Sequence, residues 1–372
     1  RDINNKASLL NSQKYFFYKF SKLKWKLISD FFSSEKTVEI YHIKSLDEFI
    51  SLGVDKNSKI FFWGKKIDKE LERYAKDNEI IINYIEDGFI RSFGLGSSLS
   101  KPLSLVFDSR GIYFDPTKQS DLEYILQNHN FTIEEKNRAK NIIELVKKLK
   151  ISKYNHQFSK DIIINKENNK QKIILIPGQV DDDMSVKYGT LDMSNIKLIK
   201  KVRDARPYDY LIYKPHPDVL SGNRVGNLDY KEVLKYVNQI VTDVDIDTMI
   251  NLSDEVHTMT SLSGFDALIR DKKVFTYGLP FYAGWGLTTD QMNSKRRDRE
   301  LTIEELAVAV YILYPKYLNP YTKELTTPED VISIIIKDKQ KYQKDILFRY
   351  YKNILGYTLP KVRNFIKNIR GL

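Results

Sequence analysis

The stretch KIILIPGQVDDDMS, residues 172–185, decides the fold of this chain. Its uninterrupted run of branched apolar residues, ended by Pro177 and Gly178, is typical of a central strand in a parallel sheet that is covered on both faces. Polar residues that follow such a strand lie at its carboxyl end, where open α/β sheets bind their ligands. A solvated acidic loop is the alternative. The residues at this strand end are Gln179, Asp181, Asp182, Asp183 and Ser185.

Strands and helices alternate on both sides of this stretch, which predicts an α/β fold of parallel sheets with crossover helices. Residues 151–171 are rich in Asn and Lys and lack periodicity, so they are the predicted linker between two similar halves. Two such halves suggest a cleft between them. The predicted strands are residues 37–43, 59–64 and 79–85 before the linker, and 172–177, 208–214, 239–244, 255–259 and 273–278 after it.

Length and composition narrow the possible classes of protein. The chain has 372 residues, enough for two ordinary domains, and no Cys, which excludes disulfides, thiolate nucleophiles and Cys-based zinc sites. It contains no apolar run of about 18 residues and no signal peptide, so we expect a protein made in the cytoplasm that is soluble or peripheral to a membrane. A first residue of Arg1 in place of Met suggests a trimmed chain.

The net charge of +11 is concentrated at the two ends of the chain. Residues 1–32 carry +5 and residues 337–372 carry +8, which leaves the middle near −2. A near-neutral middle without a zinc-finger, RRM or helix-turn-helix pattern argues against a nucleic-acid partner. We interpret the basic aromatic segment 14–32 and the basic tail as arms that could lie on an anionic membrane surface. The alternative for residues 14–32 is a helix whose aromatic face packs on the domain while its lysines stay in solvent.

Reactive groups follow further predicted strands of the second half. Lys214 and His216, each next to a proline in the sequence KPHPD, form a rigid cationic corner that could bind a phosphate. Ser263 and Gly264 open a predicted helix, so its free amides would face an anion. Because these groups and the acidic cluster end successive strands of one predicted sheet, they indicate a common site.

Two more stretches carry candidate site residues. In the first half, Glu86 and Asp87 end a predicted strand and are followed by Arg91 and by the loop GLGS, which begins at Gly94 and is a weak phosphate-loop signal. In the second half, residues 279–288, with the sequence LPFYAGWGLT, interleave aromatic residues with glycines. This pattern predicts a wall against which a ring or sugar can pack.

Six motifs occur in this order along the chain: EDGFIRSFGLG, PLSLVFDSRGIYFDP, GQVDDDMS, KPHPDV, TSLSGFDAL and PFYAGWGLT. Together they resemble the motifs of the KpsC-like capsule β-Kdo transferases over roughly residues 60–330. Members of the linker-synthesising type carry two such modules in tandem. Each motif occurs once here, so the resemblance implies a single module, either a natural single-module enzyme or part of a larger chain.

The resemblance implies a GT-B architecture, in which two Rossmann-like domains face each other across a cleft. It also implies CMP-β-Kdo as donor, retention of the β configuration, and neither a cofactor nor a metal. With these implications, the expected domains are a basic aromatic arm at residues 1–36, an acceptor-side domain at 37–158, a CMP-sugar-binding domain at 159–320 and basic C-terminal helices at 321–372.

Retention by double displacement needs a carboxylate nucleophile and a general acid/base. The DxS pattern of the family falls on Asp183 and Ser185, so the resemblance makes Asp183 the nucleophile, Glu86 the general acid/base and Asp87 the alternative to Glu86. The implied donor-binding residues are Gln179, Ser185, Lys214, His216, Pro217, Ser261, Ser263 and Gly264. The implied substrate contacts are Arg91, Gly94, Tyr282, Gly284 and Trp285.

The partners implied are CMP-Kdo, a Kdo-containing glycolipid or polysaccharide acceptor, other capsule biosynthesis proteins or modules, and an anionic membrane surface at the inner face of the inner membrane, but no nucleic acid. Two alternatives stay open. One is a related enzyme on the same fold, such as a CMP-sialic-acid transferase or a nucleotide-sugar epimerase. The other is a non-catalytic module of capsule assembly, against which the acids at facing strand ends argue.

Overall fold

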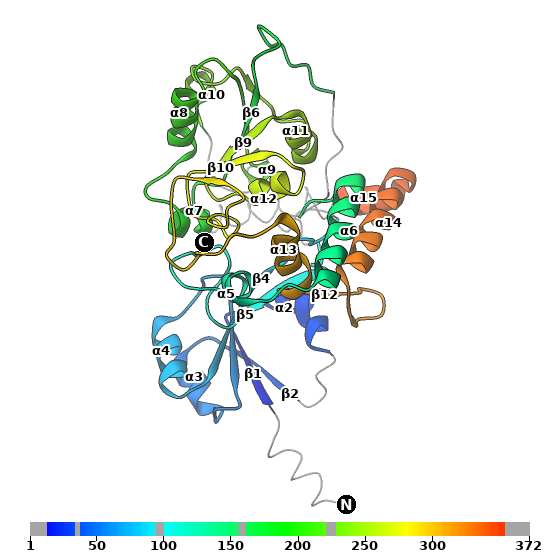
Figure 1. Cartoon of the computed structure of the whole chain (residues 1–372). Coiled ribbons are helices and arrows are strands. Elements are labelled where there is room, and N and C mark those ends of the chain that lie inside the picture. The colour runs from blue at the N-terminus through cyan, green and yellow to red at the C-terminus, as the bar shows by residue number, and fades with distance from the viewer. Residues whose placement is uncertain are drawn as a thin grey trace, which may run out of the picture.

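Two β-sheets organise the chain, and the computed structural model describes residues 13–33, 38–93, 100–153, 155, 161–220 and 228–353. Figure 1 shows the blue and cyan strands of the first sheet in the lower part of the molecule and the green and yellow strands of the second sheet in the upper part. Helices lie between and around the sheets. The predicted α/β class is therefore confirmed.

The second sheet has six strands in the order β11-β10-β9-β6-β7-β8, and all of its pairs are parallel. Its interior strand β6 contains Ile174, Leu175 and Ile176, which are fully buried, so the central strand predicted from residues 172–177 is confirmed. The strands are β6 (Ile173–Pro177), β7 (Tyr210–Lys214), β8 (Gln239–Ile240), β9 (Glu255–Thr258), β10 (Lys273–Thr276) and β11 (Thr289–Asp290).

The first sheet has seven strands in the order β13-β12-β5-β4-β3-β1-β2. The four strands from β4 to β2 are parallel, whereas β5 runs antiparallel to β4 and β12 antiparallel to β5. The first sheet is therefore mixed, whereas the sequence predicted a wholly parallel sheet. Its strands are β1 (Gln13–Tyr18), β2 (Val38–Ile43), β3 (Lys59–Trp63), β4 (Ile81–Asp87), β5 (Ser104–Asp108), β12 (Pro315–Leu318) and β13 (Leu325–Thr326).

The expectation of an N-terminal arm over residues 1–36 is wrong for the part that the structure describes. Strand β1 lies inside the first sheet between β3 and β2, and both Phe16 and Phe17 are fully buried. Phe16 belongs to the core on one face of the sheet, and Phe17 stacks on Phe61 on the other, with ring centroids 4.7 Å apart. Aromatic residues on both faces of a strand give the same run of rings as an interfacial helix, which is why the sequence was misleading.

The expected domain boundary at residue 320 is also displaced. Strands β12 and β13 complete the first sheet, so the chain has already left the second sheet before Pro315. The reason is that β5 would otherwise be an open edge, and β12 covers it by antiparallel pairing. The described residues of the expected linker, 151–153, 155 and 161–171, form neither helix nor strand.

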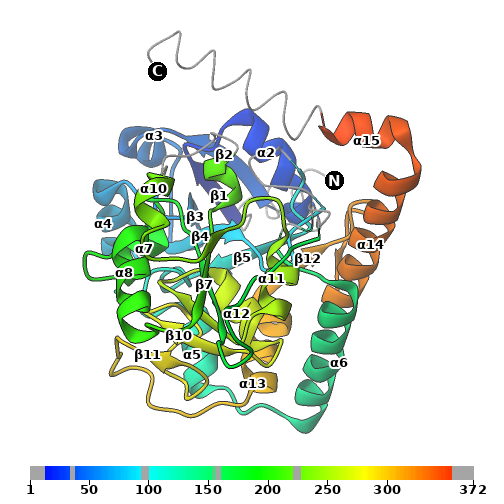
Figure 2. The ribbon, with the colours of Figure 1, turned by 90° about the horizontal axis from the view of Figure 1, so that it is seen from above.

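Helices cover both sheets, and several begin with a capping residue or a proline. Thr132 with Glu135 and Thr302 with Glu305 form capping boxes, and Pro328 starts α14. Figure 2 shows α6 beside α14 at one side of the molecule. Within the described residues, no helix combines the length and apolar character needed to cross a bilayer. The helices are α2 (Lys22–Ile28), α3 (Leu46–Ser51), α4 (Lys69–Asp77), α5 (Asp121–Asn128), α6 (Ile133–Leu149), α7 (Met184–Gly189), α8 (Asn195–Ala205), α9 (Pro217–Leu220), α10 (Tyr230–Val233), α11 (Ile246–Leu252), α12 (Leu262–Leu268), α13 (Ile303–Ala307), α14 (Pro328–Lys344) and α15 (Ile346–Asn353), with a 3-10 turn at Ser29–Phe32 and a π-helical segment at Val308–Leu313.

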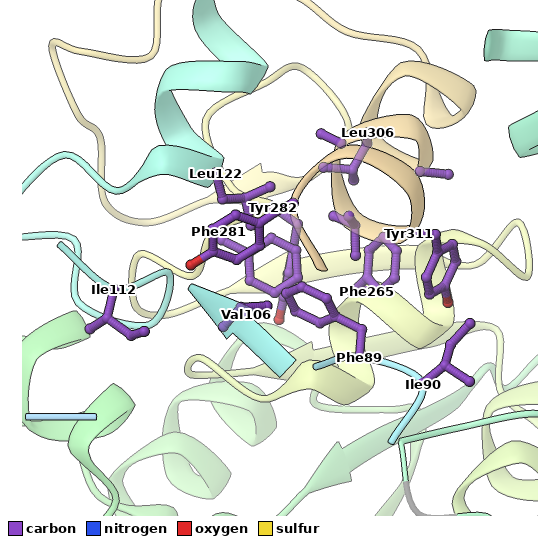
Figure 3. Close-up of a cluster of buried hydrophobic side chains, with 14 of the residues drawn as sticks. Phe89, Ile90, Val106, Ile112, Leu122, Phe265, Phe281, Tyr282, Leu306 and Tyr311 are labelled. Atoms are coloured by element: carbon purple, nitrogen blue, oxygen red, sulfur yellow. The ribbon is translucent and has the colours of Figure 1, made fainter. Parts of the chain in front are cut away.

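A continuous apolar core joins the two halves. Phe89 comes just after β4 of the first sheet. The centre of its ring lies 5.2 Å from that of Phe281 and 6.4 Å from that of Phe265, both of which belong to the second half. Figure 3 shows these rings together with Tyr282 and Tyr311. Because buried aromatic rings contribute large apolar areas, this cluster fixes the two sheets against each other.

Candidate active site

A cavity of about 820 Å³ lies between the two halves. Its walls come from the ends of β3 and β4 in the first half and from the loops after β6, β7 and β9 in the second. The cavity brings together nine of the residues predicted for the site. These are Glu86, Gln179, Asp183, Ser185, Lys214, His216, Pro217, Ser261 and Ser263.

Asp183 lies at the start of α7, just after β6. Its Oδ1 accepts a hydrogen bond from the backbone N–H of Ser185 at 2.8 Å, which fixes the carboxylate on the cavity wall. The residue is half-buried, while Asp181 and Asp182 are exposed. Of the three neighbouring acids, Asp183 is thus the one that is partly enclosed.

Gln179 and Ser185 also line the cavity, but their polar atoms bond to the neighbouring strand end. The Gln179 amide donates to Thr260 Oγ1 at 3.0 Å, and its Oε1 accepts from the Thr260 N–H at 2.9 Å. The hydroxyls of Ser185 and Thr260 lie 2.9 Å apart. This network ties the loop after β6 to the loop after β9 and so orients the acidic turn.

Glu86 faces the cavity from the opposite half. It is the last residue but one of β4, paired with Val106 of β5, so the structure places it at the strand end, as predicted. Burial, and the nearby charge of Asp87, raise the pKa of its carboxyl above the ordinary glutamate value. A Cβ added at Gly64 would come within 3.1 Å of Glu86 Oε2, so glycine at that position leaves room for the carboxylate. A carboxyl with a raised pKa suits proton transfer near neutral pH.

Lys214 is the last residue of β7 and is only 4% exposed, yet its Nζ has no hydrogen-bond partner among the residues that the structure describes. Burial lowers the pKa of the ammonium to about 8, against the opposing charges of Asp245 and Asp243. A buried cation without a hydrogen-bonding partner is costly in free energy. Since Lys214 lines the cavity, an anionic ligand group there would supply the missing partner.

His216 and the first turn of α12 complete this side of the cavity. The Nδ1 of His216 accepts from the Asp218 N–H at 3.1 Å, which leaves Nε2 to carry the proton in the neutral ring. Ser261 caps α12 by accepting from the Ser263 N–H at 3.2 Å. Gly264 does not line the cavity, because its α-carbon faces Tyr282 and any Cβ there would collide with the Tyr282 hydroxyl. The structure thus gives Gly264 a packing role against Tyr282, and its predicted contact with the CMP phosphate or ribose stays a prediction.

Asp87 and Arg91 lie outside the cavity, contrary to prediction. Arg91 is buried, its Nε lies 2.7 Å from Asp87 Oδ2, and its Nη1 donates to Ser92 Oγ at 2.9 Å. The guanidinium is therefore held inside the first half by its own neighbours. The predicted contact at Gly94 falls outside the residues that the structure describes.

The predicted aromatic wall was assigned to the wrong residues of the stretch 279–288. Tyr282 and Trp285 are fully buried and donate to the backbone oxygens of Ser261 and Phe281, the latter at 2.8 Å. Gly284 has a φ of +83°, packs on Arg297 and does not line the cavity. The cavity wall in this stretch is formed by Pro280 and Phe281.

Asp266 was not predicted, although it is the most unusual acid of the second half. It is 7% exposed, lines the cavity, and lies one helical turn after Ser263 on α12. Burial, and to a smaller extent the charge of Asp247, raise its pKa to about 6. Within the described chain, its carboxylate has no hydrogen bond or ion pair. The signal in the sequence is an acid in the otherwise apolar stretch GFDAL.

Comparison with known proteins shows relatives in capsule biosynthesis. The family model described as capsule polysaccharide biosynthesis protein matches residues 58–317. The capsule polysaccharide modification protein LipA of Neisseria meningitidis is 40% identical over 326 residues, which are 87% of this chain and 46% of LipA. The lipopolysaccharide-processing protein LpsZ of Rhizobium meliloti is 38% identical over 262 residues, which are 69% of this chain and 59% of LpsZ. The chain thus spans about half the length of these relatives.

Two solved structures are similar over most of the chain. The β-Kdo 2,7 transferase of Thermosulfurimonas dismutans KpsC superposes with a TM-score of 0.72 and 35% identity, covering 88% of this chain and 99% of that one. The β-Kdo 2,4 transferase of the same KpsC has a TM-score of 0.73 and 29% identity, covering 86% and 97%. The resemblance drawn from the six motifs is therefore confirmed.

Proposed function

Because this chain belongs to the family of capsule polysaccharide biosynthesis proteins, we propose that it is a retaining β-Kdo transferase that uses CMP-β-Kdo as donor. The similarity to the two KpsC Kdo transferases supports glycosyltransferase activity. In this proposal the two halves form a GT-B enzyme, and the cavity between them takes the donor sugar and the acceptor hydroxyl.

One observation carries the proposal most strongly. The cavity combines Lys214, a buried cation with no hydrogen-bond partner in the described part of the chain, with two carboxyl groups from opposite halves, Asp183 and Glu86. A nucleotide sugar joined through a phosphate needs a cation for the phosphate and a group that attacks the anomeric carbon. A retaining path also needs a base for the acceptor hydroxyl.

Lys214 and His216 would hold the CMP phosphate, with Ser261 and Ser263 at its other side. Charge-assisted hydrogen bonds to phosphate are stronger than neutral ones, and the low polarity around Lys214 strengthens them further. The same contacts would stabilise CMP as it departs with the electron pair of the glycosidic bond. CMP leaves as a phosphate, so this departure needs no proton from the protein.

In the first step, a carboxylate oxygen of Asp183 forms a bond to the anomeric carbon of Kdo while the bond to the CMP phosphate breaks. In the second step, Glu86 accepts the proton of the acceptor hydroxyl as that oxygen attacks the same carbon. The bond to Asp183 breaks and the carboxylate is restored. Each step inverts the anomeric centre, so the β configuration of the donor is retained.

The acceptor in this proposal is a Kdo-containing capsule glycolipid or polysaccharide. The enzyme would act in the cytoplasm, at the inner face of the inner membrane, together with other capsule biosynthesis proteins or modules. An NMR time course with CMP-Kdo and a panel of Kdo-terminated acceptors tests the proposal. We expect CMP release that depends on the acceptor and a product with a β-Kdo linkage. Absence of transfer to every acceptor, with slow hydrolysis alone, would contradict it.

A further inference from the structure

Helix α15 exposes an unusual amount of apolar surface for its eight residues. Ile346 is 75% exposed, Leu347 80% and Tyr350 67%. Figure 2 shows α15 at the outer edge of the molecule, beyond the end of α14. Large apolar side chains that gather on one exposed helix indicate an interaction surface, whereas scattered ones do not.

Cations surround these apolar residues. Lys341, Lys344 and Arg349 are exposed, and the Lys341 ammonium lies 4.8 Å from the centre of the Phe348 ring. The Arg349 guanidinium folds back onto the last turn of α14, where its Nε donates to the Tyr342 carbonyl at 3.1 Å. Apolar residues flanked by Lys and Arg form the combination that binds the interface of a bilayer with anionic lipids.

Helix α14, which directly precedes α15, reaches the cavity between the two halves. Lys339 of α14 lines the cavity, and α15 begins seven residues later, after α14 has ended at Lys344. The helix that carries α15 at its end therefore also contributes a cation to the cavity wall. A lipid-linked acceptor could reach the cavity from a surface that contacts α15 without leaving the membrane.

We propose that the exposed face of α15, formed by Ile346, Leu347 and Tyr350 with Lys341 and Lys344 beside it, docks on an anionic lipid bilayer. We name this set the α15 patch. The role of docking in delivering an acceptor rests on the proposed function, whereas the docking itself does not. Charge complementarity selects the bilayer over a second copy of this basic chain, because two such patches would repel each other.

Co-sedimentation with vesicles of phosphatidylcholine, with and without phosphatidylglycerol, tests the α15 patch. We expect the protein to bind the mixed vesicles at low salt, to release as salt screens the attraction, and to bind pure phosphatidylcholine weakly. Leu347→Asp should weaken partition into the mixed vesicles by about tenfold or more, because it removes apolar area and adds a repelled charge. Leu191→Asp is the matched control, since Leu191 is 79% exposed in the loop after α7 and should leave binding unchanged.

Several results would overturn the proposal. One is failure of the wild-type protein to bind anionic vesicles at low salt. Another is equal partition of Leu347→Asp and Leu191→Asp. A third is a dimer in sedimentation velocity that Leu347→Asp, but not Leu191→Asp, converts to monomer. Turnover of a short soluble acceptor should be the same in Leu347→Asp and wild type. Vesicle binding without any turnover would leave docking in place and remove the transferase proposal instead.

Discussion

Two motif-rich regions of the second half, the strand end at Lys214 and the loop 279–288, look equally functional in the sequence but differ in the structure. In the loop, the polar groups of Tyr282, Gly284 and Trp285 all bond within the protein. At the strand end, Lys214 is buried, and none of the described residues forms a hydrogen bond with its Nζ. The polar groups of the loop are satisfied within the protein, which favours a scaffold role, whereas the ammonium at the strand end would gain a partner from an anionic ligand.

The largest expected effect concerns the scaffold side of this comparison. Arg297 is buried, donates to the carbonyls of Pro280 and Ala283, and bonds through Nη2 to Glu123 Oε2 at 2.9 Å in the first half. Arg297→Met would leave the Glu123 carboxylate buried with only part of its partners. We expect a loss of about 3–5 kcal/mol in the free energy of unfolding, measured by urea denaturation.

The control for Arg297→Met is Arg138→Met, which removes a more exposed ion pair with Glu329. An exposed pair is worth roughly 0–1 kcal/mol, so this variant should remain close to wild type. Equal losses in the two variants would contradict the view that the loop is held from the first half by a buried charge.

The second-largest effect concerns the contribution of Asp266 to the pH dependence of stability. Like the ammonium of Lys214, the carboxylate of Asp266 has no hydrogen-bonding partner among the described residues. Because burial raises the pKa of Asp266 to about 6, whereas an aspartate in an unfolded chain has a pKa of about 4, the folded state binds the extra proton between about pH 4 and pH 6. Stability should therefore fall as pH rises through this window, by about 3 kcal/mol for a shift of two units. Asp266→Asn should remove this part of the pH dependence.

Denaturation at pH 4 and pH 7 measures the effect, and Asp182→Asn is the control because Asp182 is exposed. The difference between wild type and Asp266→Asn isolates the contribution of Asp266 from those of other buried acids. A pH dependence that is unchanged in Asp266→Asn would show that this carboxyl titrates normally.

The smallest effect concerns Lys214, whose substitution should weaken CMP binding but should not lower the stability of the unliganded protein. Lys214→Met removes a charge-assisted bond to the donor phosphate, which is worth roughly 1.5–3 kcal/mol or about one to two decades in CMP affinity by calorimetry. It should not destabilise the unliganded protein, because it also removes a buried charge that has no hydrogen-bond partner. In the wild-type protein, CMP affinity should fall as pH rises through about 8, where the ammonium loses its proton.

Lys66→Met is the matched control, since Lys66 also lines the cavity but is exposed. Its loss should change CMP affinity only slightly. If the two variants weaken CMP equally, the affinity reflects the general charge of the cavity and not the buried site at Lys214.

The sequence predicts those elements whose hydrophobic pattern matches the burial that they have in the fold. The run at 173–176 can only be a buried strand, and β6 has that place. The pattern fails at Phe16 and Phe17, because a strand with aromatic residues on both faces lacks the alternation by which a strand is recognised. For the site, residue type and strand-end position identify Asp183 and Lys214. Whether Trp285 is exposed, or whether Asp266 faces a cavity, depends on tertiary packing that one sequence does not specify.

The most direct test of the central claim is the bond between Kdo and Asp183. In Glu86→Gln the acceptor hydroxyl would lack its base, and general acid/base assistance is typically worth about 10²–10⁴ in rate, so the Kdo adduct should accumulate. Intact-protein mass spectrometry after incubation with CMP-Kdo and acceptor should show the addition of one Kdo. Peptide fragmentation should place it on Asp183, and Asp183→Asn should lack it. An adduct on Asp181 or Asp182 would move the nucleophile, and full transferase activity in Asp183→Asn would contradict the account.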